Sequence, residues 1–160
     1  MRPAGLTVSR SRILPPGKPA GRSAAAPRPA GGPWSAASNP LRVLIVDDHP
    51  AFAESLRSLL SVDDRIEVVG WAENGEQAVE LATSLEPDLI VMDLDMPIMN
   101  GVEATRVLSK SALVLLLTGS DSASDIALAR SAGAAAYLRK GDNSADVVAS
   151  VLLLGSRLCA

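Results

Sequence analysis

Short apolar runs alternate along this chain with segments in which apolar residues recur at helical spacing. The run from Val43 to Val46 is continuous, which is typical of a strand covered on both faces. Pro50 then opens a segment whose apolar residues recur every three or four positions, which predicts a helix with one apolar face: Phe52, Leu56, Leu59 and Leu60.

The same alternation continues to the end of the chain. Further strands are predicted at 66–71, 89–92, 113–117 and 135–138. Further helices are predicted from Gly75 to Pro87, from Gly101 to about Lys110, from Ser120 or Asp121 to about Ala132, and from Asn143 to Leu154. Strands that alternate with helices predict an α/β fold. We expect a flavodoxin-like, doubly wound, five-stranded parallel sheet of order 2-1-3-4-5 with five helices.

The first 39 residues differ from the rest in composition. They are rich in Pro, Ala, Gly and Ser and hold few large apolar residues, so we expect residues 1–39 to be a disordered tail. Four interpretations of this tail stay open: a solvated extension, a start codon placed too far upstream, a transit peptide and a nucleic-acid-binding arm. The expected domain spans 40–155, and 156–160 is a short C-terminal tail without an output domain.

The charge is divided between these parts. Residues 1–40 carry six basic residues and no acid, whereas 41–160 carry nine basic residues and all 18 acids. A domain this acidic repels a polyanion, so we expect no direct nucleic-acid binding. The longest apolar run has six residues, too few to cross a membrane, and a lone cysteine fits a reducing compartment, so a cytoplasmic protein is expected.

Polar side chains stand where the predicted strands end. Asp47 and Asp48 follow the first strand, Asp93 ends the third, Thr118 ends the fourth, and Lys140 follows the fifth. Each alone would more often be a helix cap, a loop hydroxyl or a solvated charge. Because the carboxyl ends of parallel strands meet at one crevice, we expect them to converge there.

Converging carboxylates repel one another unless a cation lies among them, and a few hard oxygen ligands favour Mg²⁺. A hydroxyl and an ammonium opposite them suit a phosphoryl group, and an aspartate beside the metal can be its nucleophile. No glycine-rich phosphate loop is present, and one histidine cannot support a Ser/His/Asp triad. We expect that histidine, His49, to be a surface residue rather than a base or ligand.

Four segments resemble the response regulator receiver domain of two-component signalling. The resemblance covers about residues 41–154 and includes the D-x-x-M-P-x-x-x-G loop after the phosphoacceptor strand. It is strongest with the branch that usually carries a C-terminal helix-turn-helix. The segments that carry it are LRVLIVDDHP from Leu41, DLIVMDLDMPIMNG from Asp88, LTGS from Leu117 and YLRK from Tyr137.

This resemblance implies that Asp93 accepts a phosphoryl group from a sensor histidine kinase. It implies that Asp47, Asp48 and Asp93 hold Mg²⁺ together with the main-chain carbonyl of Asp95, and that Lys140 binds the phosphoryl group. Such a protein is a regulatory phosphoacceptor rather than an enzyme, and it loses its phosphoryl group slowly.

The resemblance also implies a switch, in which Thr118 moves to the phosphoryl group and Tyr137 is the coupled aromatic residue. The fourth helix, fifth strand and fifth helix would then present a changed face to a downstream protein or a second copy. Because six residues after the fifth helix cannot form a DNA-binding domain, a stand-alone receiver and a shortened regulator both stay open.

Two other classes of function compete with this reading. Asp93-Leu94-Asp95 is a D-x-D sequence like that of haloacid-dehalogenase-type phosphotransferases, although that family places it on the first strand and continues it differently. A pseudo-receiver that binds partners without phosphorylation is the second, but such domains typically lose an acid, the threonine or the lysine.

Overall fold

The computed structural model describes residues 40–120 and 122–159. The tail expected at 1–39 therefore lies outside the described residues. The chain alternates strands and helices in the order β1 (Leu41–Val46), α1 (Pro50–Leu60), β2 (Ile66–Ala72), α2 (Gly75–Leu85), β3 (Leu89–Asp93), α3 (Gly101–Leu108), β4 (Leu113–Thr118), α4 (Ala123–Ala132), β5 (Ala136–Arg139), α5 (Ser144–Ser156) and the 3-10 helix η2 (Arg157–Cys159).

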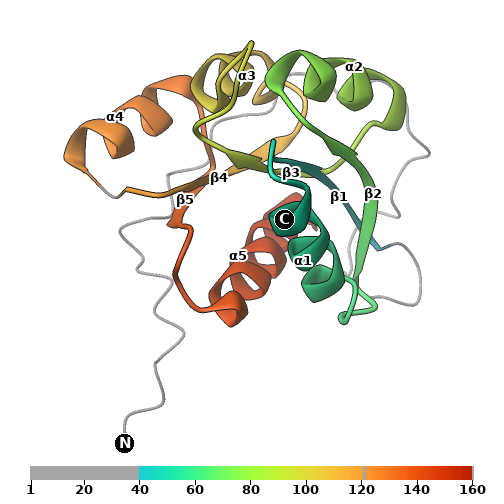
Figure 1. Ribbon diagram of the computed structural model, residues 1–160. Helices are drawn as coiled ribbons and strands as arrows, with labels where there is room; N and C mark the ends of the chain where they lie inside the picture. Colours follow the sequence, from blue (N-terminus) through green and yellow to red (C-terminus); the bar gives the residue numbers. More distant parts are fainter. Residues whose placement is uncertain (1–39, 121, 160) are drawn as a thin grey trace, which may run out of the picture.

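The five strands form one parallel sheet in the order β2-β1-β3-β4-β5, which confirms the predicted flavodoxin-like topology. Helices α1 and α5 cover one face of the sheet, and α2, α3 and α4 cover the other (Figure 1). Two apolar clusters fill the space between the sheet and each helical layer. Every residue of β3 is buried, which is why the central strands read as continuous apolar runs.

Strand β2 lies at an edge of the sheet and is more exposed than its neighbours. Its pairing with β1 shifts between Val43 and Leu44, so that Val68 and Gly70 have partners while Val69 has none. This is a β-bulge, a common way to twist an edge strand away from further pairing.

Side chains cap most of the helices where the sequence predicts their ends. Asn100 and Glu103 form a capping box at the start of α3, and Gly133 ends α4 in the left-handed region with φ 94°. The start of α4 differs from the expectation of Ser120 or Asp121. Ser122 is the cap, since its hydroxyl accepts the amide of Asp125 at 3.2 Å. Helix α5 runs to Ser156, one residue past the expected domain end.

The parallel arrangement brings the strand ends to one edge of the sheet. Asp47 directly follows β1, Asp93 and Thr118 are the last residues of β3 and β4, and Lys140 directly follows β5. In the part of the chain that the structure describes, no helix has the length and apolar character needed to cross a membrane.

Candidate functional site

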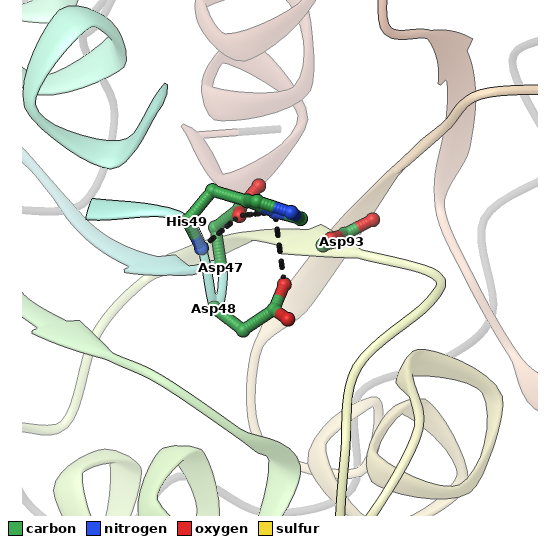
Figure 2. Close-up of side chains that lie close together, drawn as sticks. All are labelled: Asp47, Asp48, His49 and Asp93. Atoms are coloured by element: carbon green, nitrogen blue, oxygen red, sulfur yellow. Dashed lines mark hydrogen bonds and ion pairs between the residues drawn. The ribbon is translucent and has the colours of Figure 1, made fainter. Parts of the chain in front are cut away.

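An acidic cluster lies at the carboxyl ends of β1 and β3 (Figure 2). Asp47, Asp48, His49 and Asp93 each contribute one potential ligand atom, and these atoms lie within 4.8 Å of one another. Asp47 and Asp93 are buried, whereas Asp48 is partly exposed and His49 faces solvent. The structure therefore brings together the carboxylates that the strand ends predict, and it adds an imidazole to them.

Lys140 reaches into this cluster from the end of β5. Its Nζ lies 2.7 Å from Oδ2 of Asp47 and 3.0 Å from Oδ2 of Asp93. The same ammonium lies 4.5 Å from the ring centroid of Phe52 on α1, a cation–π contact. One ammonium is thus shared by two buried carboxylates.

This sharing explains the direction of both pKa shifts. Burial raises the pKa of the Asp93 carboxyl, and the hydrogen bond and charge of Lys140 offset this only in part. Burial alone would lower the pKa of Lys140, but its hydrogen bonds to Asp47 and Asp93 and their charges raise it above its usual value. The ammonium is strongly held, while Asp93 keeps a charge that is incompletely compensated.

The donor set fits a divalent cation. Three carboxylates and one ammonium leave two net negative charges, and the carboxylates are the hard ligands that Mg²⁺ prefers. Oδ1 of Asp48 is buried and accepts no hydrogen bond from the described residues, although Nδ1 of His49 lies 3.0 Å away. A buried carboxylate oxygen without a hydrogen-bond donor destabilises the folded state unless a cation pairs with it.

The loop after β3 returns closely to the phosphoacceptor position predicted from the sequence. The amide of Asp95 donates to Oδ1 of Asp93 at 3.3 Å, and the amide of Gly101 donates to the carbonyl of Leu94 at 2.9 Å. A Cβ on Gly101 would lie 2.3 Å from the Asp93 carbonyl oxygen. Glycine is therefore required where α3 begins against the end of β3.

Thr118 and Tyr137 lie beside the cluster on β4 and β5. Thr118 is buried, its Oγ1 accepts the amide of Ser120 at 3.1 Å, and its carbonyl accepts the amide of Lys140 at 2.6 Å. The hydroxyl of Tyr137, also buried, donates to the carbonyl of Ser120. Both side chains thus act on the loop that leads from β4 to α4.

Sequence patterns did not predict two contacts of this site. The His49 side chain is 66% exposed, in line with a surface residue, but its Nδ1 also lies 3.1 Å from Oδ1 of Asp47. The position of His49 directly after two aspartates is the sequence feature that could have indicated this contact. Trp71 donates its indole N–H to the main-chain carbonyl of Asp47 at 2.9 Å, across 24 residues, and no local pattern predicts that contact.

Comparison with known proteins places these residues in a wider context. A family model described as "Response regulator receiver domain" matches residues 43–152. The nitrate/nitrite response regulator protein NarL of Escherichia coli (strain K12) is 40% identical over 112 residues, covering 68% of this chain and 52% of that protein. The transcriptional regulatory protein LnrK of Bacillus subtilis (strain 168) is 39% identical over 116 residues, covering 71% and 52%.

A solved structure agrees with the sequence matches. The signal receiver domain of the putative response regulator NarL from Mycobacterium tuberculosis superposes with a TM-score of 0.70 at 31% identity, covering 74% of this chain and 98% of that one. The chain spans about half the length of the curated relatives named above (52% of each) and nearly all of the isolated domain.

Proposed function

This chain belongs to the response regulator receiver domain family, and from that premise we propose that Asp93 accepts a phosphoryl group from a sensor histidine kinase. The observation that carries the proposal is the placement of Lys140, whose Nζ lies 3.0 Å from Oδ2 of Asp93 in a cluster with two net negative charges. Phosphoryl transfer needs an oxygen nucleophile, a divalent cation and a cation for the transferred oxygens, and this cluster supplies residues for each.

In the proposed reaction, a carboxylate oxygen of Asp93 attacks the phosphorus of a phosphohistidine. The P–N bond breaks, the imidazole leaves, and an aspartyl phosphate remains. Lys140 is close enough to pair with an oxygen of the transferred group. Asp47, Asp48, Asp93 and the main-chain carbonyl of Asp95 would hold Mg²⁺, which offsets the negative charge of the phosphoryl oxygens.

Phosphorylation would then act on the neighbouring switch residues. It adds a charge of about −1.5 to −2 and three acceptor oxygens beside the β4–α4 loop. Thr118 would turn its hydroxyl toward these oxygens, releasing the amide of Ser120. Tyr137 holds the carbonyl of that same residue, so the change reaches α4, β5 and α5. That face would bind a downstream protein or a second copy, without direct nucleic-acid binding, in the cytoplasm.

The proposed role is regulatory, with self-phosphorylation and slow self-dephosphorylation as its only chemistry. A haloacid-dehalogenase-type enzyme is disfavoured because Asp93-Leu94-Asp95 begins at the end of the third strand of this fold. The pseudo-receiver alternative is disfavoured because Asp47, Asp93 and Lys140 form one hydrogen-bonded and ion-paired cluster.

Intact mass spectrometry after incubation with Mg²⁺ and a small-molecule phosphodonor tests the proposal. We expect one phosphoryl adduct that is labile to base, depends on Mg²⁺ and is absent in Asp93→Asn. Asp95→Asn is the matched control, because it keeps the main-chain carbonyl and the acceptor, and it should still form the adduct. A folded protein that takes up no phosphoryl group would favour the pseudo-receiver instead. Rapid release of phosphate from varied phosphomonoesters would favour the enzyme.

A further inference from the structure

We propose that Trp71 is a positioning residue for the phosphorylation site, because its indole holds the peptide that joins Asp47 to Asp48. The inference rests on the proposed function, in which both aspartates serve that site. It assigns the direction of the Asp48 carboxylate to a side chain of the edge strand β2, which is not itself a member of the acidic cluster.

Asp47 lies where the pairing of β1 with β2 stops. The last Cα pair of the ladder is Val46 with Ala72, and the amide of Asp47 still donates to the carbonyl of Ala72 at 3.0 Å. Strand β2 ends at Ala72, and the indole N–H of Trp71, which donates to the Asp47 carbonyl at 2.9 Å, takes the place of the next strand amide. Since Asp47 is buried and a buried carbonyl needs a donor, the indole satisfies the end of β1.

The chain changes direction directly after this carbonyl. Successive side chains of a strand point to opposite faces, so a continued β1 would separate the carboxylates of Asp47 and Asp48. Instead both supply an atom to a group whose members lie within 4.8 Å of one another, and the chain bends at Asp48 (Figure 2). Because the peptide between the two aspartates carries the carbonyl that Trp71 binds, the indole fixes the plane from which the chain turns.

The Asp48 carboxylate depends on this backbone more than the Asp47 carboxylate does. Lys140 and the amide of His49 both donate to the carboxylate of Asp47, at 2.7 and 2.8 Å. Oδ1 of Asp48 accepts no hydrogen bond from the described residues, and the His49 ring that lies 3.0 Å away is 66% exposed. A peptide free to rotate would therefore let the Asp48 carboxylate leave the cluster.

The ring of Trp71 has a second set of neighbours on helix α1. It lines a surface depression together with Pro50, Ala53, Glu54 and Arg57. An analogue of the same shape keeps this packing, so the effect of the N–H can be separated from that of the ring. Benzothienylalanine replaces the N–H by sulfur, which cannot donate, whereas azatryptophan keeps the N–H and is the matched control.

The test removes the N–H from Trp71 alone. The chain has two tryptophans, Trp34 and Trp71, so each analogue is incorporated into the full chain with Trp34→Phe. For each protein, the rate of adduct formation from a small-molecule phosphodonor is measured against Mg²⁺ concentration, and calorimetry gives the dissociation constant of Mg²⁺.

Benzothienylalanine should raise both the dissociation constant and the half-saturating Mg²⁺ concentration roughly 10-fold, as loss of support around a metal does. The rate at saturating Mg²⁺ should change less than about twofold, because Asp93 and Lys140 belong to other segments of the chain. Azatryptophan should behave as tryptophan does. With tryptophan itself in place, the indole N–H should exchange with solvent more slowly than that of free tryptophan, as NMR would show.

A merely structural role would give a different result. It would lower the rate at saturating Mg²⁺ and leave the half-saturating concentration unchanged. That result, or indole exchange as fast as in free tryptophan, would overturn the inference. The exchange measurement needs no analogue, so it stands even where an analogue folds poorly.

Two outcomes separate this inference from the proposed function. Weaker Mg²⁺ binding without the N–H, in a protein that forms no adduct even with tryptophan, would refute the proposed function alone. An adduct whose Mg²⁺ dependence is the same with and without the N–H would refute the positioning role alone.

Discussion

Replacing Gly101 by alanine should displace the loop that carries the proposed phosphoacceptor and metal ligands. The new Cβ would lie 2.3 Å from the carbonyl oxygen of Asp93 and 2.8 Å from Cα of Leu94, both backbone atoms. Ordinary contact begins at 3.4 Å, so the end of β3 and the start of α3 must separate by about 1 Å. The hydrogen bond from the Gly101 amide to the Leu94 carbonyl lies in the same place and should lengthen.

The magnitude follows from two opposing terms. Overpacking of this kind costs about 1–3 kcal/mol, while alanine is favoured over glycine in a helix by up to about 1 kcal/mol. We expect a net loss of about 1–2 kcal/mol in the free energy of unfolding, which lowers Tm by about 4–10 °C. Because a 1 Å misplacement of a reacting group can reduce a rate roughly 100-fold, the rate of adduct formation on Asp93 should fall about 10–100-fold.

Thermal denaturation by circular dichroism and the time course of adduct formation by intact mass measure the two effects. Gly119→Ala and Gly141→Ala are matched controls, because they flank the same crevice and a Cβ at either meets no atom within 4 Å. Both should keep the Tm and the rate of the parent protein within error. A Gly101→Ala protein that is as stable and as rapidly phosphorylated as these controls would refute the reasoning.

Three further predictions follow from the same contacts. Lys140→Met keeps the apolar stem but leaves the buried carboxylates of Asp47 and Asp93 without their ammonium. The substitution should lower the free energy of unfolding, measured by chemical denaturation, by about 2–3 kcal/mol and abolish the adduct. An unchanged denaturation midpoint would contradict the shared ion pair. Because burial raises the pKa of Asp93 above its ordinary 3.8, the native state holds that proton to higher pH than the unfolded chain, and stability falls as pH rises through this window. In EDTA, the Tm of Asp93→Asn relative to the parent should therefore increase with pH above 3.8 and then level off, whereas a difference independent of pH would count against the raised pKa. Tyr137→Phe removes the hydroxyl that donates to the Ser120 carbonyl. It should lower the free energy of unfolding by about 1 kcal/mol and speed amide hydrogen exchange in the β4–α4 loop. Unchanged exchange there would show that the hydrogen bond does not restrain the loop.

Several features of the site follow from the chain itself. The apolar runs predict buried parallel strands, and parallel strands place their carboxyl ends at one edge. Asp47, Asp93, Thr118 and Lys140 are therefore neighbours by topology alone. The caps at Asn100 and Gly133 are local in the same sense, because each depends on residues within one helical turn.

Other features arise only when distant segments pack. The bulge at Val69 depends on the pairing of two strands. The indole of Trp71 reaches the Asp47 carbonyl across 24 residues. Such contacts produce no periodic pattern in the sequence, because each of them involves a single pair of residues.

The order of the elements, the fold and the carboxylates of the acidic cluster were determined by the sequence, because hydrophobic periodicity and parallel topology are properties of the chain in one dimension. Tertiary structure decided how the charges are shared. It placed one ammonium, on Lys140, between two buried carboxylates, and it turned the remaining oxygens of Asp47 and Asp48 toward His49. Electrostatic and coordination chemistry depend on separations of a few ångströms, and only packing in three dimensions sets those separations.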